Sequence, residues 1–519
     1  MAQTGQLLSD RVASNTYTNR FINMISAVTT FGNSSNDVAI TEFPHVMTEF
    51  RAAVSVGSPS KTFNLLLDTG SFDMWIFGTN CRSPACLTAK NKYDVTQSRT
   101  GSDLKTSALG GKYADGSGYG GDRVKDNVSI GPASLTGFEF TQVTSYVSQG
   151  GSSMNPSDND SDGIVGMGFK PQTSNTKVTN SFIDQVIATK ALSKNLFSYY
   201  IDVSETSGTV SLGGINTSFF QNSSSNVSWI PMLTDSSLAS GKLALPLFRV
   251  WIDKVKVEEF TSHASSASTS TEGTTGSAII DTGTSQAIVS NVLIDAIGTR
   301  LKGAQKVFLN GRNSGPYTYV MDCVLKAENG GPTVTLEFAG GITLPITALE
   351  YVSAPVNNQC QLVLQSSNGG FKQGTYLIGN TFLKRFVTVF DYDQMRIGFA
   401  LGLGRSTNAS ISYDASLPGY TQGPFGGSGG ISRFFGVSQQ KLMFWGTLLF
   451  GLTLLALLCT CGIRACSRRK NQEQQVLPSM APTILYDKEY QQYPNFNLQP
   501  PEYQPQYSRD QQSGNRQYA

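Results

Sequence analysis

The tripeptide Asp-Thr-Gly occurs twice in the 519 residues of this chain, beginning at Asp68 and at Asp281. Each copy follows a short apolar run and is itself followed by a hydroxyl residue. An Ile-Val-Gly or Leu-Ile-Gly tripeptide recurs downstream, and its glycine, Gly166 or Gly379, lies 98 residues after the corresponding aspartate. One Asp-Thr-Gly is an ordinary turn sequence, but two copies with the same distant partner indicate a duplicated lobe.

A pair of such lobes could hydrolyse peptide bonds. Each aspartate is expected on a tight turn at the end of a strand, so two facing lobes would bring the carboxyl groups of Asp68 and Asp281 together. Carboxylates about 3 Å apart cannot both ionise, and the pair therefore keeps one proton. The ionised member can take a proton from water while the protonated member donates to the carbonyl oxygen of the substrate. The sequence thus predicts direct attack by water, at acidic pH, without a covalent enzyme intermediate.

Composition argues against several other kinds of site. The chain has only two histidines and no His-Glu-x-x-His motif, so a histidine-rich metal site is not expected. The formal net charge is +2, and no basic stripe is interleaved with aromatic residues, which argues against a nucleic-acid partner. We therefore expect no metal and no cofactor.

The elements that must position the two aspartates are predicted to be strands. From residue 50 to about residue 400, short apolar runs are separated by Gly, Ser and Asn, which is typical of an all-β body. The length exceeds that of one ordinary domain and favours a two-lobed or multi-domain body. Two helices are expected, over 181–192 and 291–301, with Asn180 and Ser290 as their N-caps.

Residues 46–400 resemble pepsin-like aspartic proteases at four motifs. The segment 68–75, DTGSFDMW, is similar to that family's DTGSSNLWV. The segments 113–117, YADGS, and 162–168, DGIVGMG, look like its YGTGS flap and its DGILGLA, and 376–400 matches the family's end. The resemblance implies an all-β, bilobal fold with an N-lobe over about 46–230 and a C-lobe over about 231–400.

The resemblance also implies roles for the residues beside the pair. The hydroxyl residues would hydrogen-bond the outer carboxyl oxygens, the threonines would brace the two turns against each other, and the glycines would let backbone approach the carboxylates. These residues are, in that order, Ser71 and Thr284, Thr69 and Thr282, and Gly70 and Gly283.

A flap over the polypeptide substrate is implied by the same resemblance. Tyr113, Gly116 and Ser117 would lie on this β-hairpin, with the Tyr113 hydroxyl bonded toward Trp75. Asp115 stands where the family has threonine, and we expect it to disfavour acidic side chains in the substrate.

Four of the seven cysteines lie in the body: Cys81, Cys86, Cys323 and Cys360. They lack zinc-site spacing, so disulfides in an oxidising compartment are favoured, and three pairings are possible. The resemblance implies the pairs Cys81–Cys86 and Cys323–Cys360. The family's small disulfide loop before the second aspartate is missing, and a low-complexity segment, 261–277, is expected there as a flexible loop.

The C-terminal part is predicted to anchor the protein in a membrane. Residues 442–463 form a run of 22 uncharged positions, which is long enough for a transmembrane helix. Arginine and lysine residues follow this run and place the C-terminus in the cytosol. Seven Asn-x-Ser/Thr sequons precede the run and none follows it, so we expect a glycosylated body in the lumen or outside the cell.

Three further segments complete the predicted organisation. Residues 1–45 form an N-terminal segment of uncertain role, and 1–40 show no sustained apolar run that would serve as a signal peptide. Residues 401–441 are a Gly/Ser-rich linker, and 464–519 are expected to be a disordered cytosolic tail. We expect a monomeric, single-pass membrane protein of the secretory or endolysosomal system or the cell surface.

Two alternatives to an endopeptidase stay open at this level. A binding protein of pepsin-like fold that has lost catalysis would usually lack an aspartate or have a distorted motif, whereas both motifs are intact here. A membrane receptor would use the long C-terminal tail, although nothing in the body requires that role. Acidic-pH cleavage that a statine-type inhibitor blocks would separate an endopeptidase from both.

Overall fold

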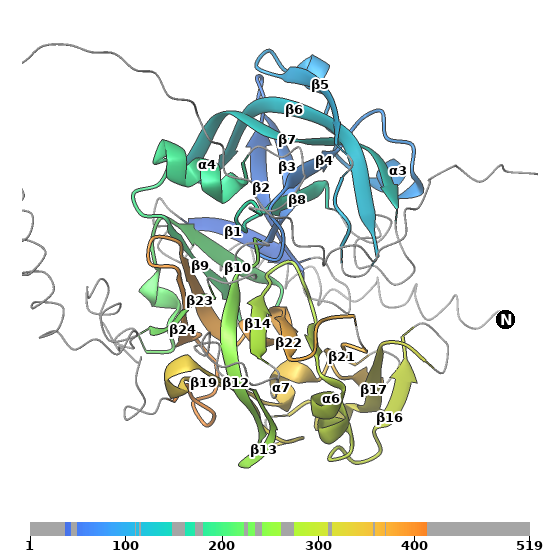
Figure 1. The fold of residues 1–519 in the computed structure, drawn as a ribbon, viewed down its shortest axis with the longest axis vertical. Helices are drawn as coiled ribbons and strands as arrows, with labels where there is room; N and C mark the ends of the chain where they lie inside the picture. The colour runs from blue at the N-terminus through green and yellow to red at the C-terminus, as the bar shows by residue number, and fades with distance from the viewer. Residues whose placement is uncertain are drawn as a thin grey trace, which may run out of the picture. The chain divides into compact units, whose positions relative to one another are not determined.

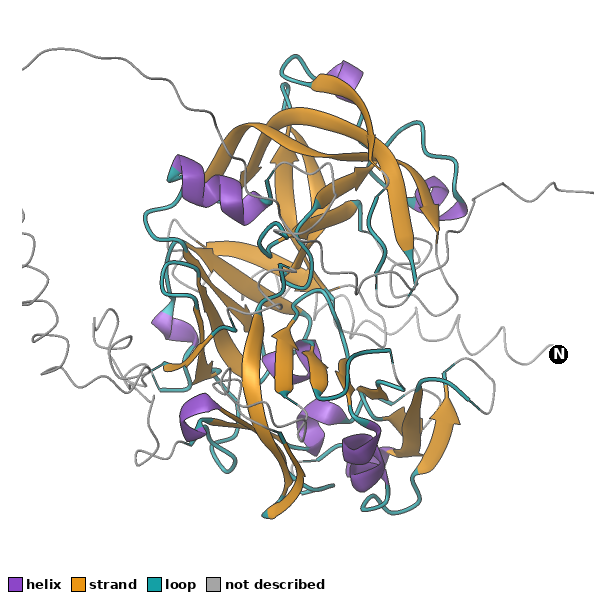
Figure 2. Ribbon diagram, in the orientation of Figure 1, coloured by secondary structure: helices purple, strands orange, loops and turns teal. Residues whose placement is uncertain are grey.

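The computed structural model describes residues 37–42 and 49–412, apart from 109, 114–115, 148–160, 172–179, 223–226, 234–240, 261–274, 310–313, 328, 356–358 and 369. The fold of these residues is mostly β, with a few short helices (Figure 2). All of them belong to one compact unit of the chain. In this described part, no helix is long and apolar enough to cross a membrane. The predicted span 442–463 and tail 464–519 lie outside the described residues.

The largest sheet has 13 strands in the order β11-β24-β23-β9-β10-β1-β2-β3-β8-β4-β7-β6-β5. Its strands are β1 (Asp37–Glu42), β2 (Phe50–Val56), β3 (Lys61–Asp68), β4 (Met74–Phe77), β5 (Ser102–Ala108), β6 (Gly118–Ile130), β7 (Ala133–Val147), β8 (Gly163–Gly166), β9 (Leu196–Ile201), β10 (Ser207–Leu212), β11 (Ser228–Pro231), β23 (Phe386–Asp391) and β24 (Arg396–Leu401). The last two strands pair with β9 and β11, so the end of the body returns to its first half (Figure 1).

Two smaller sheets are built from the second half of the body. One has eight strands, in the order β19-β18-β12-β14-β22-β15-β21 with β13 paired to β12, and the other has three, in the order β16-β17-β20. These strands are β12 (Ala244–Ile252), β13 (Val255–Glu259), β14 (Gly276–Ile280), β15 (Ala287–Val289), β16 (Gln305–Phe308), β17 (Tyr317–Asp322), β18 (Val334–Phe338), β19 (Thr343–Ile346), β20 (Gln359–Gln361), β21 (Leu364–Ser366) and β22 (Thr375–Ile378). The arrangement is consistent with the predicted all-β, bilobal fold.

The helices of the described residues are short. They are α3 (Pro84–Thr88), α4 (Phe182–Thr189), α6 (Asn291–Gly298), α7 (Ala348–Tyr351) and α8 (Asn380–Leu383), with 3-10 turns η1 (Val95–Gln97), η2 (Thr217–Phe219), η3 (Cys323–Leu325) and η4 (Ala339–Gly341). Both predicted helices are present as α4 and α6, and Ser290 caps α6 as predicted.

The predicted cap of α4 and both predicted helix ends were wrong. Ser181, not Asn180, is the N-cap of α4, because its hydroxyl accepts from the Asp184 amide while the Asp184 carboxylate accepts from the Ser181 amide. Helix α4 ends at Thr189 rather than at residue 192, since Lys190 takes the left-handed conformation with φ 52°. Helix α6 ends at Gly298, short of the predicted residue 301.

Three predicted segment boundaries also shift. Strand β1 pairs with β2 and β10, so residues 37–42 are part of the folded body although the sequence placed them in the segment 1–45. Ser412 forms a β-bridge with Thr343, which brings the start of the predicted linker into the fold. Strand β14 begins at Gly276, and the predicted loop 261–277 therefore ends earlier than expected.

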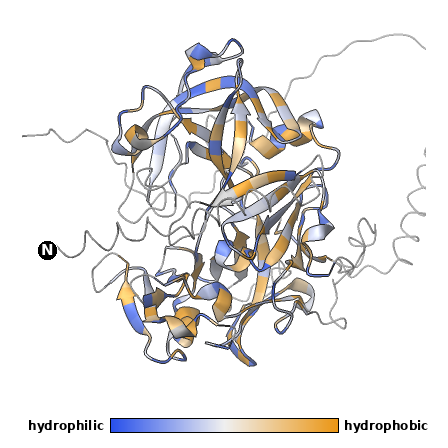
Figure 3. Ribbon diagram, turned by 180° about the vertical axis from the view of Figure 1, so that it is seen from behind, coloured by the Kyte–Doolittle hydropathy of each residue, from blue (hydrophilic) through white to orange (hydrophobic). Residues whose placement is uncertain are grey.

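The burial patterns explain why these segments form strands. Strand β6 alternates between buried and more exposed positions over most of its 13 residues, as expected for a strand with one face on the core. The last four residues of β3 and all six of β23 are buried, because these strands are covered on both faces. In Figure 3 the apolar residues follow the strands, whereas many turns are hydrophilic.

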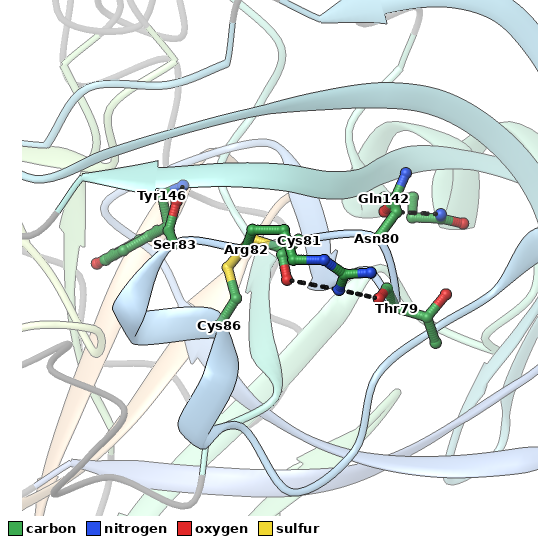
Figure 4. The surroundings of a disulfide bond; sticks show 8 residues. All are labelled: Thr79, Asn80, Cys81, Arg82, Ser83, Cys86, Gln142 and Tyr146. Carbon is green, nitrogen blue, oxygen red and sulfur yellow. Dashed lines mark hydrogen bonds between the residues drawn. A yellow bond between two sulfur atoms is a disulfide. The ribbon is translucent and has the colours of Figure 1, made fainter. Parts of the chain in front are cut away.

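Both predicted disulfides are present, Cys81–Cys86 and Cys323–Cys360. The first lies where the chain enters α3 (Figure 4), and the Ser83 hydroxyl in this loop accepts a hydrogen bond of 2.9 Å from the Tyr146 amide on β7. The second ties η3 to β20 across 37 residues of sequence. The first bridge therefore ties the loop before α3 to that helix, and the second ties a 3-10 turn to a strand.

The longer loop should make the second disulfide the more stabilising of the two. Loop-closure entropy predicts about 4 kcal/mol for Cys323–Cys360 and about 2 kcal/mol for Cys81–Cys86. Urea unfolding of the Cys323→Ala/Cys360→Ala variant should show the larger drop in unfolding free energy, with the Cys81→Ala/Cys86→Ala variant as its matched control. Equal losses would contradict the entropic account.

Candidate active site

The two Asp-Thr-Gly turns follow equivalent strands. Strand β3 ends at Asp68 and runs parallel to β8, with Asp68 beside Gly166. Strand β14 ends directly before Asp281 and runs parallel to β22, and the Asp281 amide donates to the carbonyl of Ile378 at 3.0 Å. Each aspartate therefore lies beside the apolar-apolar-Gly tripeptide found downstream of it in the sequence, 164–166 for Asp68 and 377–379 for Asp281. The 98-residue repeat corresponds to a repeated strand pairing.

Each turn holds its own carboxylate in the same way. The Gly70 amide donates to Asp68 Oδ1 at 2.8 Å, and the Gly283 amide donates to Asp281 Oδ1 at 2.9 Å. The second oxygen of each carboxylate accepts from a hydroxyl, that of Ser71 for Asp68 and that of Thr284, at 2.8 Å, for Asp281. These donors fix the orientation of both carboxyl groups.

Reciprocal hydrogen bonds of two threonines lock the turns together. The Thr69 hydroxyl donates to the Ile280 carbonyl at 2.7 Å and accepts from the Thr282 amide at 2.9 Å. The Thr282 hydroxyl donates to the Leu67 carbonyl at 2.6 Å and accepts from the Thr69 amide at 3.2 Å. Both threonines are almost fully buried. Because buried polar groups are costly to leave unpaired, this arrangement resists separation of the turns.

The glycine after each threonine lies against the carboxylate of the opposite turn. A Cβ atom added to Gly70 would overlap Asp281 Oδ2, and one added to Gly283 would overlap Asp68 Oδ1. Only a residue without a side chain therefore permits the two carboxyl groups to meet. The structure thus brings together all eight residues that the sequence grouped at this site.

This close fit gives a prediction. A Gly283→Ala variant should fold but lose about 10²-fold in peptide cleavage, because the Asp68 carboxylate must move by a substantial fraction of an ångström. The exposed Gly370, where an added Cβ meets only a backbone oxygen at 3.2 Å, supplies the control Gly370→Ala. Unchanged kcat/KM in Gly283→Ala would show that the fit is looser than the geometry indicates.

The two carboxyl groups are buried. Asp68 and Asp281 expose only 5% and 7% of their surface. Burial raises the pKa of the Asp281 carboxyl well above its usual range, and the charge of Asp68 and a hydrogen bond between the two groups raise it further. The Thr284 hydroxyl and the Lys242 ammonium act in the opposite direction on this pKa. The arrangement favours a protonated Asp281.

The predicted flap residue Tyr113 contacts Trp75 and feels the charge of Asp68. The Tyr113 hydroxyl accepts a hydrogen bond of 2.7 Å from Trp75 Nε1, and Trp75 is fully buried on β4. The turn that follows is closed by the Tyr113 amide to Ser117 at 2.9 Å and by the Gly116 amide to Tyr113 at 3.0 Å. Gly116 has φ 86°, which suits glycine. Asp115, and with it the predicted subsite bias, lies outside the described residues.

A buried ion-pair network behind the flap was missed from the sequence. Arg123, which is fully buried, donates from Nη1 to Asp73 at 2.9 Å and from Nε to Glu139 at 3.1 Å. Asp73 also accepts from the Tyr119 hydroxyl at 2.7 Å. The Tyr119 ring stacks on that of Trp75 with centroids 5.1 Å apart. The one signal in the sequence was Asp73 itself, which stands where the motif DTGSSNLWV has asparagine.

Among the described residues, no three His, Cys, Asp or Glu side chains gather as a metal site requires. The predicted lack of a metal and of a cofactor stays a prediction.

Comparison with known proteins adds independent evidence. Residues 49–402 match the family model of eukaryotic aspartyl proteases. The chain is 26% identical over 360 residues to the acid protease of Saccharomycopsis fibuligera, covering 68% of this chain and 80% of the relative. It is 27% identical over 367 residues to dog pepsin B, covering 67% and 80%, and 29% identical over 357 residues to penicillopepsin-1 of Penicillium rubens, covering 68% and 78%.

Proposed function

The chain belongs to the eukaryotic aspartyl protease family, and on that premise we propose that it is an endopeptidase in which Asp68 and Asp281 activate water. The observation that carries the proposal is the meeting of two buried carboxyl groups from turns that Thr69 and Thr282 lock together. An inactive binding protein of the same fold would not need this geometry, so the structure does not favour that alternative.

The mechanism follows from the single shared proton. A water molecule between the two groups gives a proton to Asp68 while its oxygen attacks the carbonyl carbon of the peptide bond. Asp281 gives its proton to the carbonyl oxygen, and a neutral tetrahedral diol forms. Asp68 then passes its proton to the amide nitrogen, and one hydroxyl of the diol returns a proton to Asp281 as the C–N bond breaks. A carboxylic acid and an amine leave, and the pair again holds one proton. The raised pKa of Asp281 supports its role as the acid in the first step.

Tyr113 is proposed to close the flap over the polypeptide. Its hydroxyl is held by Trp75 at 2.7 Å, and burial, followed by the charge of Asp68, raises its pKa well above the usual value. The hydroxyl therefore stays protonated at every pH at which the enzyme would act. A neutral, fixed flap residue can exclude bulk water from the cleft without adding charge beside the aspartates.

We propose that the enzyme acts at acidic pH and is tethered to a membrane. Acidic operation is supported by the need to keep one proton on the pair and by the similarity to a relative named acid protease. Tethering by residues 442–463, with the body in the lumen or outside the cell, is supported by the uncharged run, the basic residues after it and the one-sided sequons. In sealed microsomes, added protease should digest the tail 464–519 and leave the body intact, and a protected tail would contradict this orientation.

The function is tested with the full-length protein in detergent. Cleavage of a fluorogenic peptide library is measured between pH 3 and pH 7, with and without a statine-type inhibitor. We expect inhibitor-sensitive cleavage at internal peptide bonds that is greatest in the acidic range. Absence of cleavage by folded protein, with no binding of the inhibitor, would refute the proposal.

A further inference from the structure

A lysine that the sequence did not single out reaches the first Asp-Thr-Gly turn. Lys242 precedes β12 and is half-buried, and its ammonium donates a hydrogen bond to the Gly70 carbonyl oxygen. Gly70 is the residue whose backbone lies against the Asp281 carboxylate. The positive charge is therefore anchored to the turn of Asp68, at the residue that lies against the Asp281 carboxylate.

The backbone around Lys242 is fixed by both halves of the site. The carbonyl of the next residue, Leu243, accepts a hydrogen bond of 2.9 Å from Ile280, which directly precedes Asp281. On the other side, a Cβ added to Gly168 would lie 2.7 Å from the Gly241 carbonyl oxygen, so this segment also packs closely on the loop after β8. The position of the ammonium is set by these contacts and not by the lysine stem alone.

Two titratable groups from other elements act on the pair: Lys242 before β12, whose charge acts on Asp281, and Tyr113 on the flap, which feels the charge of Asp68. Tyr113 stays neutral, and Lys242 supplies positive charge that Asp281 feels. Its effect on the Asp281 pKa is downward, against burial and against the charge of Asp68.

We propose that Lys242 is a positioning residue whose ammonium stabilises the singly ionised Asp68–Asp281 pair and so keeps the enzyme active at lower pH. The proposal rests on the proposed function. The pair becomes neutral when it takes up a second proton at low pH, and it becomes doubly negative when it loses its last proton at high pH. A nearby cation favours the more negative state in each step, so both transitions move to lower pH.

The alternative is that Lys242 only ties the Gly70 carbonyl in place. Two substitutions separate charge from length. Lys242→Met removes the charge and keeps an unbranched side chain, whereas Lys242→Arg keeps the charge and the donor. Lys254 lies in the exposed turn between β12 and β13, at the other end of β12 from Lys242. Lys254→Met removes one positive charge there and controls for the net charge of the molecule.

The test is the pH profile of kcat/KM for one peptide with the full-length protein. For Lys242→Met we expect both limbs to shift upward by about one pH unit, so that activity falls on the acidic limb and rises up to about tenfold on the alkaline limb. Lys242→Arg and Lys254→Met should follow the wild type. Damage to the fold cannot produce the gain on the alkaline limb.

A second readout does not need turnover. The affinity of a statine-type inhibitor for Lys242→Met, measured by calorimetry across pH, should shift in the same direction. Superimposable profiles for wild type and Lys242→Met in both measurements, or a shift to lower pH, would overturn the proposal. A wild-type protein that neither cleaves peptides nor binds the inhibitor would instead refute the proposed function.

Discussion

The Asp281→Asn variant is expected to lose about 10⁴-fold in kcat/KM for peptide cleavage while keeping its fold. Asparagine cannot give the acidic proton to the carbonyl oxygen of the substrate. The fold should survive because the threonine bonds between the turns use backbone groups and hydroxyls, not the carboxylates. Asp253→Asn is the matched control, since Asp253 lies in the β12–β13 turn at φ 54°, a conformation that asparagine tolerates.

The paired variant sharpens this test. Asp68→Asn should be as inactive as Asp281→Asn, and the double variant should be no worse than either, because the two groups act as one unit. Losses that multiply in the double variant would show that the two carboxyl groups act independently. Residual activity near the wild-type level in either single variant would end the proposed mechanism.

Stability provides a readout that does not depend on activity. The folded-state pKa of Asp281 is raised above its unfolded value of about 4. Its contribution to the free energy of unfolding is therefore fully present below the unfolded pKa and is lost as pH rises through the folded pKa. Asp281→Asn removes this dependence. Its melting temperature should therefore rise relative to the wild type between pH 4 and pH 8. A melting temperature of Asp281→Asn that falls further below that of the wild type as pH rises would contradict this prediction.

The second large effect is expected at the buried ion pair behind the flap. Arg123→Met should lower the unfolding free energy by about 3–5 kcal/mol, because it leaves Asp73 and Glu139 buried beside an apolar side chain. Urea unfolding with a fixed slope measures this loss. The exposed ion pair of Lys105 with Asp103 supplies the control, since Lys105→Met should change stability little.

A double variant distinguishes lost charge compensation from lost packing. Asp73→Asn in the Arg123→Met background should recover part of the stability, because the uncompensated negative charge at position 73 is gone. Its asparagine can still accept a hydrogen bond from the Tyr119 hydroxyl. If the double variant is as unstable as the sum of the two singles, packing of the arginine stem, and not its charge, dominates.

The network also connects stability to the flap. Asp73 holds the Tyr119 hydroxyl, the Tyr119 ring stacks on Trp75, and Trp75 holds the Tyr113 hydroxyl. Loss of Arg123 should therefore raise KM at temperatures where the variant is still folded, because the flap tyrosine is less well fixed. The chain of contacts makes this a local effect and not a consequence of global unfolding.

Most of the site could be predicted from local sequence. The Asp-Thr-Gly turns, the apolar runs before them and the downstream glycines are short-range patterns, and strand pairing in the structure follows them closely. The caps and ends of the helices were less predictable. At α4 two adjacent residues, Asn180 and Ser181, both suit an N-cap, and the choice depends on which one lets Asp184 return its hydrogen bond.

Residue type and short spacing were enough to identify the two aspartates, the glycines beside them and the strands that precede them. Which other distant side chains join them depends on how the sheets pack in the folded protein. Lys242 and Gly70 are 172 residues apart, and Arg123 and Asp73 are 50 apart. Such contacts arise from the register and packing of whole sheets, and no periodicity in the chain encodes them.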